Sequence, residues 1–398
     1  MPLDIVSHRP PRLARTAARV PAPPIPACRA WAGRFDGVLL DLTQAVPGYA
    51  PHPELLARIA TAAGDPSFAR YGLLEGEVAL REAMAEELGL LYGGSPTPDD
   101  IRITAGANTA FNLAMSVLTS PGDAVLLPAP WFFNHQMALA LRGVEALALP
   151  CLAEAGFLPD FDRAAAMIGP RIRALILVTP NNPTGAVMPP ELVERFAELC
   201  RERGIWLVLD ETYRDFLPED HGPPHHLLER TDWRDFVVQL YSFSKAFCIP
   251  GHRLGAVSAG PVFREAFIKA VDNIQICPPR PPQEALAWGV SALRDWRRAN
   301  ARMMQARGVT FLDALAQAPG WKVEASGGYF AWLRVPEEGP DALAVAEGLA
   351  AEHGLVTLPG SFFGPGGERH LRLAFANLDD STIPEVGRRL HAWSRSQP

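Results

Sequence analysis

The sequence has no apolar run approaching the roughly 18 residues that a membrane span requires and no charged-then-apolar segment of the kind that opens a secretory signal. Its five cysteines are scattered, odd in number and without a CxxC pair, so neither a disulfide framework nor a zinc site is predicted. No half of the chain carries a concentrated basic stripe, and the net charge is −7. These absences argue against nucleic-acid and membrane partners and favour a cytoplasmic protein with a small-molecule or protein partner.

What the sequence does contain is enough apolar material for a large core. Of its 398 residues, 48% are hydrophobic and 20% charged, which suits two domains or one large α/β domain carrying a smaller one. The first residues, MPLDIVSHRPPRLARTAARVPAPPIP, are rich in arginine, but their prolines would break an amphipathic transit helix. We therefore expect an extended arm that lies on a neighbouring surface.

Strand and helix patterns alternate along the middle of the chain. Three short apolar runs without alternation, RALILVTP (173–180), GIWLVLDE (204–211) and DFVVQLYSFSK (235–245), predict strands of a parallel sheet that is covered on both faces. Between the first two, ELVERFAELCRER has the apolar spacing of an amphipathic helix. This order indicates βαβ units.

The C-terminal part of the sequence has a different order of elements from the middle part. Residues 291–317 predict one long helix, followed by shorter strands in GGYFAWLRV, GLVTLPGSFFG and ERHLRLAFAN. We therefore expect an N-terminal arm with part of a small domain in residues 1–50, a large domain in 51–290 and a small C-terminal domain in 291–398.

Polar groups collect after the predicted strands, where open α/β sheets bind ligands. In PNNPTG, the ring of Pro183 restricts Asn182 to extended geometry, and AGANTAFNLAM is a small-residue turn that feeds a helix N-terminus. The five strand ends offer an anion cradle at AGANTAFNLAM, an aromatic face at Trp131, an amide at Asn182, a carboxylate and a phenol at Asp210 and Tyr213, and an amine at Lys245.

Each of these features has an ordinary structural alternative. PNNPTG alone is a turn, Asp210 could cap a helix, Trp131 could belong to the core, and Arg253 could be a surface ion-pair partner. Together, however, they match the needs of a pyridine-aldehyde cofactor with a phosphate tail: an amine, a carboxylate for the ring nitrogen, a ring to stack on and a cationic phosphate cup.

From about DLTQAVPGY to LRLAFAN, the chain resembles the fold type I pyridoxal-phosphate enzymes, and among them the class I/II aminotransferases related to aspartate aminotransferase. NNPTG, DETY and SFSK…GHRLG carry the resemblance, with Asp210 at a spacing of 28 from Asn182 and Lys245 at a spacing of 35 from Asp210. It implies an α/β fold, with a mainly parallel seven-stranded sheet in a large domain and a smaller α+β domain.

The resemblance also implies roles for single residues. Lys245 would form the Schiff base with pyridoxal 5'-phosphate and later shuttle the proton, and Asp210 would hold the pyridinium. Asn182 and Tyr213 would donate to the phenolate oxygen of the ring, on which Trp131 would stack. The phosphate ligands would be Gly106, Ala107, Asn108, Ser242 and Arg253, with Ser244 close by.

Two further roles concern the substrate and a second subunit. In HLRLAFA, Arg372 alternates with bulky apolar residues and shares its face with alanines, which leaves room for a ligand. The resemblance matches it to the arginine that binds the substrate α-carboxylate; an exposed ion-paired arginine is the alternative. Tyr71, in ARYGLLEG, matches a tyrosine that reaches the partner subunit's cofactor phosphate, which implies a homodimer with shared sites.

The chemistry of Lys245 can be argued directly. A lysine in a confined site beside Arg253 is disfavoured as an ammonium, so it can act as a nucleophilic amine near neutral pH.

The substrate-binding residues would be Ala45, Asn182 and Trp131 together with Arg372.

The sequence departs from the family pattern at the substrate lip. LTQAVPGY places Ala45 and Val46 where the family usually has a glycine before the proline, which would narrow the site or change its substrates. Arg280, in ICPPRPPQEA, could bind phosphate, bind a distal acid of the substrate or lie at the surface. His135 is a further possible pocket residue, and HGPPHH predicts a solvated loop rather than a metal site.

These observations predict a pyridoxal-phosphate-dependent aminotransferase that acts on an α-amino acid with a 2-oxo acid acceptor. The same groups would also support β-elimination by a C–S lyase, or a replacement or oxidative reaction. A non-catalytic effector-binding domain of a transcription regulator is a third class. It would need an attached DNA-binding domain, for which the roughly 40 residues before the match are too few and too rich in proline.

Overall fold

A mainly parallel sheet of seven strands forms the centre of the molecule, as predicted. The computed structural model describes residues 12–396. The strand order is β2-β8-β7-β6-β5-β3-β4, and only β8 runs antiparallel to its neighbours. The strands are β2 (Ile101–Thr104), β3 (Ala124–Ala129), β4 (Glu145–Pro150), β5 (Ile172–Val178), β6 (Trp206–Asp210), β7 (Val237–Ser242) and β8 (Gly255–Ala259).

Helices cover both faces of this sheet, which explains the unbroken apolar runs of its strands. Successive side chains of a strand point to opposite faces. In β6, Leu207 and Leu209 pack in the cluster that contains Phe196 of helix α8 (Pro190–Arg203), whereas Val208 packs in the cluster that contains Phe111 of α5 (Ala107–Leu118). The βαβ prediction is therefore confirmed.

The other helices of this part of the chain are short to medium in length. They are α3 (Pro53–Gly64), α4 (Val78–Tyr92), α6 (Phe133–Leu141), α7 (Phe161–Met167), α9 (Phe243–Ala246), α10 (Pro261–Ile274) and α11 (Arg280–Ala292). Within residues 12–396, every helix is too short or too polar to cross a membrane.

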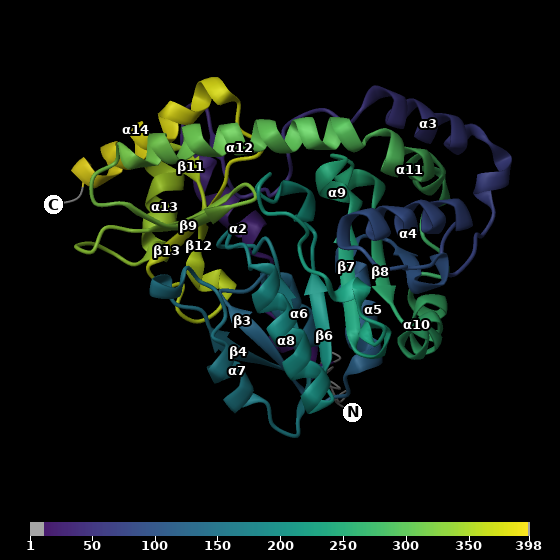
Figure 1. Cartoon of the computed structure of the whole chain (residues 1–398). Helices are drawn as coiled ribbons and strands as arrows, with labels where there is room; N and C mark the ends of the chain where they lie inside the picture. Colours follow the sequence, from purple (N-terminus) through teal and green to yellow (C-terminus); the bar gives the residue numbers. More distant parts are fainter. Residues whose placement is uncertain (1–11, 397–398) are drawn as a thin grey trace, which may run out of the picture.

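A second, smaller sheet lies beside the first and is joined to it by a long helix. Its order is β12-β13-β10-β9, and a separate parallel pair joins β1 to β11. Helix α12 runs along the top of the molecule from α11 to the small sheet and α14 (Figure 1). The elements are β1 (Leu40–Asp41), β9 (Lys322–Gly327), β10 (Phe330–Arg334), β11 (Leu355–Val356), β12 (Leu358–Pro359), β13 (His370–Ala374), α12 (Arg294–Ala316), α13 (Ala342–His353) and α14 (Ile383–Ser396).

The long helix predicted over residues 291–317 begins slightly later than expected, because α11 ends at Ala292 and α12 starts at Arg294. The predicted C-terminal strands are present. The domain limits near residues 50 and 290 stay a prediction.

The expectation of an extended N-terminal arm is wrong for the described residues. Two short helices form there, α1 (Arg15–Arg19) and α2 (Pro24–Trp31). Pro24 opens α2, where a missing N–H costs nothing because the first turn has no intrahelical partner for it. Helix α1 packs on α6 and α2 packs on α13 of the same chain. Residues 1–11 lie outside the described residues.

Candidate active site

A cavity of about 140 Å³ opens at the carboxyl ends of β5, β6 and β7, beside the N-terminus of α5. Nine residues that the sequence singled out line it: Ala107, Asn108, Asn182, Asp210, Tyr213, Ser242, Ser244, Lys245 and Arg253. Four further lining residues were not proposed as ligands: Phe132, Val178, Thr212 and Pro250. Thr212 lies inside the quoted DETY, but nothing in the sequence pointed to Val178 or Pro250.

Lys245 lies one turn beyond β7, on the short helix α9. Its Nζ donates to the carbonyl oxygen of Ala45 at 2.6 Å, and it lies 5.8 Å from the centre of the Tyr213 ring. Loss of hydration and the positive charges of Arg372 and Arg253 lower the pKa of Lys245 to about 8. A substantial fraction of this amine is therefore neutral, and so nucleophilic, near physiological pH.

Asp210 ends β6 as a buried carboxylate. His135 Nε2 lies 3.1 Å from its Oδ2, and the Thr212 N–H donates to its Oδ1 at 3.0 Å. Burial acts to raise the pKa of Asp210, but the hydrogen bonds from His135 and Thr212 outweigh it and hold the pKa below its usual value. The cavity therefore contains a fixed negative charge at neutral pH.

His135 does not line the cavity itself but contacts the lining residue Asp210 from behind the cavity wall. Its ring is buried and stacks on Phe111, with 4.1 Å between the ring centres. The sequence suggested His135 only as a possible pocket residue, because its spacing from Trp131 gave no sign of a partner on a different strand.

Asn182 and Tyr213 meet in the lining of the cavity. Asn182 Nδ2 donates to Tyr213 Oη at 3.4 Å, and Asn182 Oδ1 accepts from Arg372 Nη1 at 3.2 Å. Burial raises the pKa of Tyr213 well above its ordinary value. Tyr213 is therefore a neutral hydrogen-bond donor across the physiological pH range.

The N-terminus of α5 and Arg253 form the cationic end of the cavity. Ala107 and Asn108 are the first residues of α5, where backbone N–H groups have no intrahelical acceptor. Gly106 precedes them at φ +92°, and a Cβ there would lie 2.2 Å from Arg253 Nη2. Only glycine allows the guanidinium to approach the backbone this closely.

Two serines continue this end of the cavity. Ser242 caps α9 by accepting from the N–H of Ser244 at 3.3 Å. Both serines therefore line the cavity at the start of the turn that carries Lys245.

Arg372 lies on β13 and is 1% exposed. Besides the bond to Asn182, its Nη2 donates to the carbonyl oxygen of Thr43, and its Nε has no hydrogen-bond partner. No carboxylate among residues 12–396 forms an ion pair with it, so the alternative of an exposed, ion-paired arginine is wrong. Burial lowers the pKa of Arg372 to about 10, which still leaves it charged at neutral pH.

A buried cation without an anion is costly unless a ligand supplies the missing charge. Phe330 and Phe363 flank the Arg372 guanidinium, each with its ring centre 5.4 Å away. This aromatic setting partly compensates the charge. The unpaired donors nevertheless favour a carboxylate ligand at this position.

The interpretation of Trp131 as the stacking ring requires a correction. Phe132 lines the cavity and Trp131 does not. The backbone N–H of Trp131 donates to the carbonyl oxygen of Phe363 at 2.8 Å, and the indole ring packs against Gly364. These contacts turn the indole toward the 360–364 segment, so the neighbouring residue faces the cavity instead.

Tyr71 and Arg280 do not reach the cavity of their own chain. Tyr71 is 78% exposed. Arg280 Nε donates to Glu77 at 2.5 Å and its Nη1 donates to the carbonyl oxygen of Ser67 at 2.7 Å. These contacts of Arg280 hold the segment around Tyr71 in place. Within the described chain, Arg280 is therefore engaged in structural contacts, which favours the surface alternative over a role in binding phosphate or substrate.

The prediction of a solvated HGPPHH loop is wrong for its middle histidine. His225 is fully buried, with Nε2 3.3 Å from Glu211 Oε1 and its ring 4.6 Å from that of Tyr92. Glu211 follows Asp210, so this contact ties the loop to the end of β6. No cluster of three or more potential metal-ligating side chains occurs in residues 12–396.

Comparisons with known proteins agree with this geometry. The family model described as aminotransferase class I and II matches residues 38–390. An aspartate/prephenate aminotransferase of Thermus thermophilus is 31% identical over 360 residues, covering 87% of this chain and 89% of that protein. An aromatic aminotransferase of Arabidopsis thaliana is 28% identical over 358 residues, covering 88% of each.

Solved structures show the same likeness. The aspartate aminotransferase of Thermus thermophilus with maleate superposes with a TM-score of 0.87 at 26% identity, covering 96% of this chain and 100% of that one. An aminotransferase of Mycobacterium tuberculosis superposes with a TM-score of 0.88 at 26% identity, covering 98% and 100%.

Proposed function

Because the chain belongs to the class I and II aminotransferases, a family of fold type I enzymes that uses pyridoxal 5'-phosphate, we propose that its cavity binds this cofactor through Lys245. The enzyme is an aminotransferase. We further propose that its donor is an α-amino acid and its acceptor a 2-oxo acid. One observation carries the proposal: an amine, a buried carboxylate and a cationic helix N-terminus converge in one cavity beside an unpaired buried arginine.

The residues present fit the cofactor. The α5 N-terminus with Arg253 suits a phosphate, Asp210 suits a protonated ring nitrogen, and Phe132 offers a ring face. When bound, the cofactor supplies an aldehyde that condenses with amines and a pyridinium ring that accepts electrons.

The chain's own residues would then hold and move protons. Asp210, ionised and braced by His135, would keep a proton on the ring nitrogen. Asn182 and Tyr213 would donate to the ring's phenolate oxygen. Lys245 would carry the proton to and from the substrate α-carbon, since its pKa of about 8 lets it both accept and release a proton near neutral pH.

Arg372 would fix the substrate by its α-carboxylate. Its present acceptors, Asn182 Oδ1 and the Thr43 carbonyl, are neutral, and a carboxylate is a stronger acceptor for a guanidinium. The lip that contains Ala45 is tied to this site, because the Ala45 carbonyl accepts from both Lys245 and Tyr329. We therefore assign Ala45 a positioning role through its backbone.

We propose a cytoplasmic homodimer in which Tyr71 completes the partner's site. Tyr71 is exposed and lies away from the cavity of its own chain, as a residue that serves a second subunit would be. All five cysteines are unpaired, which fits a reducing compartment.

Borohydride reduction followed by peptide mapping tests the cofactor assignment. The phosphopyridoxyl label should be on Lys245 and absent from Lys245→Ala. Label on another lysine, or no label on the protein supplied with the cofactor, would remove Lys245 from this role.

A screen of amino donors tests the reaction type. We expect the absorbance change to the pyridoxamine form and a matching 2-oxo acid product. Release of ammonia with pyruvate, or of peroxide, in place of that conversion would instead assign elimination or oxidation.

A further inference from the structure

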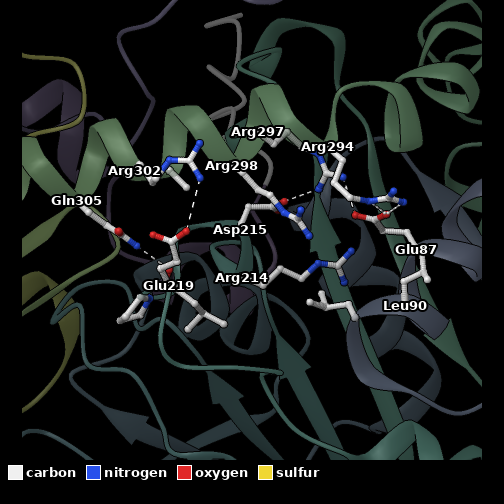
Figure 2. A pocket seen from close by; sticks show the side chains of 14 residues that line it. Glu87, Leu90, Arg214, Asp215, Glu219, Arg294, Arg297, Arg298, Arg302 and Gln305 are labelled. Carbon is white, nitrogen blue, oxygen red and sulfur yellow. Dashed lines mark hydrogen bonds and ion pairs between the residues drawn. The ribbon is translucent and has the colours of Figure 1, made fainter.

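A second cavity, of about 450 Å³, lies away from the proposed active site, beneath the first half of α12. The end of α4 and the segment that follows β6 close its other sides (Figure 2). Its charged lining residues come from positions far apart in the sequence: Glu87, Arg214, Asp215, Glu219, Arg294, Arg297, Arg298 and Arg302.

Two carboxylates are fully engaged in holding this cavity together. Glu87 pairs with Arg294 at 2.7 Å and with Arg297 at 2.6 Å, and Asp215 pairs with Arg297 at 2.6 Å and accepts from Tyr241 at 2.8 Å. These buried contacts fix α12 to α4 and to the segment after β6. Because Glu87 and Asp215 are occupied by these pairs, Glu219 is the one acidic residue of the described lining left for the other arginines of the cavity.

Three arginines of the lining keep donors without a close anion. The side chain of Arg298 is 67% exposed, and its ion pair with Asp295 is 3.9 Å long. The side chain of Arg302 is 55% exposed, and its ion pair with Glu219 is 3.6 Å long. Both distances are beyond that of a hydrogen bond. Arg214 is almost entirely buried. Its described contacts are one long hydrogen bond to Tyr92 Oη, at 3.4 Å, and the faces of the Tyr92 and Tyr241 rings.

Arg214 is the most informative of the three. No carboxylate among residues 12–396 lies within ion-pair distance of its guanidinium. Figure 2 shows Arg214 on the side of the cavity opposite Arg298 and Arg302 of α12. Guanidinium groups on two sides of one cavity can bind the same multivalent anion, each through its own N–H donors.

We propose that this cavity binds a small multivalent oxyanion, a carboxylate or a phosphate, at a site separate from the proposed active site. Guanidinium forks bind both groups through paired hydrogen bonds, and the volume is that of a small-molecule site. The net charge of −7 disfavours a long polyanion, because only the local cavity is basic. Arg214 follows Tyr213 directly, so the bound anion would contact the segment that carries this active-site phenol.

Isothermal titration calorimetry of the protein saturated with pyridoxal 5'-phosphate tests the proposal, because the cofactor occupies the other phosphate site. Citrate and pyrophosphate are titrated separately at low ionic strength, which distinguishes a carboxylate from a phosphate ligand. We expect at least one to bind, with affinity about tenfold or more weaker in Arg298→Gln/Arg302→Gln, since the charged hydrogen bonds from both guanidinium groups are lost.

The matched control is Arg388→Gln/Arg395→Gln, which removes the same charge from the exposed face of α14. That helix packs near Ala314, at the other end of α12. The control should bind like the wild type. The proposal is overturned if neither anion binds, if the cavity variant binds as tightly as the wild type, or if both double variants weaken binding equally. If the cavity double variant does not fold, Arg298→Gln and Arg302→Gln are titrated singly under the same criteria.

Discussion

Lys245 shows how a few neighbours set the chemistry of one side chain. Dehydration and the charges of Arg372 and Arg253 favour its neutral form, while the Ala45 carbonyl keeps its Nζ in place. An exposed lysine has a pKa near 10.4 and would be almost wholly an ammonium at neutral pH. The environment of Lys245 therefore supplies the reactivity that the proposed function needs.

The pH dependence of cofactor binding follows from this lowered pKa. The neutral amine is the nucleophile, so the rate at which the cofactor-free protein condenses with pyridoxal 5'-phosphate should rise with pH through about 8 and then level off. Stopped-flow absorbance from pH 6 to 10 measures it. Arg372→Gln removes one cation and should move the midpoint upward, whereas the distant Lys269→Arg should not. A wild-type midpoint near 10 would contradict the argument.

Arg372 should act on substrate binding rather than on the cofactor. In Arg372→Lys the paired hydrogen bonds are lost, and KM for amino donors should rise about 10- to 100-fold, with a smaller change in kcat. Steady-state kinetics measure both, with Arg388→Lys on the surface as the control. An unaltered KM would reassign Arg372.

Phe132 and Trp131 give opposite expectations. Phe132→Leu should weaken cofactor binding by up to about tenfold, as a lost ring–ring contact of about 0.5–1.5 kcal/mol implies. Trp131→Leu should instead lower the melting temperature, because its indole packs on Gly364 outside the cavity. Fluorescence titration and thermal unfolding separate the two. The reverse pattern would restore Trp131 as the stacking ring.

At the scale of elements, the turn that connects β2 to α5 depends on one glycine, Gly106. At φ +92° and with Arg253 2.2 Å from an ideal Cβ, Gly106 lets the helix N-terminus and the guanidinium face the same point. The strand-to-helix turn is therefore where we propose that the cofactor phosphate binds, and the sequence of this turn already suggested an anion site.

Gly106→Ala should displace Arg253 and weaken cofactor affinity by about tenfold or more, with a stability loss of roughly 1–3 kcal/mol for the unfavourable backbone conformation. Gly251→Ala is the control, because it lies in the neighbouring turn with nothing within 4 Å of its Cβ. Cofactor titration and chemical unfolding measure both quantities. Equal behaviour of the two variants would show that the close approach has no role.

At the scale of the whole molecule, the proposed dimer shares its sites between chains. Tyr71 is exposed on one chain and would complete the cavity of the other. The contacts of Arg280 with Glu77 and Ser67 keep its segment in place. A site divided in this way can be rebuilt from two defective chains.

Mixing Tyr71→Ala with Lys245→Ala through unfolding and refolding should restore activity that neither variant has alone. In the mixed dimer, one site combines an intact Lys245 with the partner subunit's Tyr71. Random pairing would give about a quarter of the wild-type sites. Activity is assayed before and after subunit exchange, with each variant refolded alone as the control. No recovery, despite mixed dimers by native mass spectrometry, would place Tyr71 outside the partner's site.

The sequence by itself determined the βαβ order and the set of polar residues that follow the strands. Both depend on local patterns: apolar runs, the restriction of Asn182 by Pro183, and the fact that parallel strands end at one edge of the sheet. Nine residues chosen from these patterns or from the family resemblance line one cavity.

Only the tertiary structure decided which side chains turn toward that cavity and which partners they meet. Phe132 replaced Trp131 because the indole packs on a segment more than 200 residues away in the chain. Packing between distant elements also places His135 against Asp210 and buries His225 against Glu211. The same packing places Arg214 in one cavity with the arginines of α12. Such contacts depend on how helices and sheets fit together in space, which no local pattern of residues encodes.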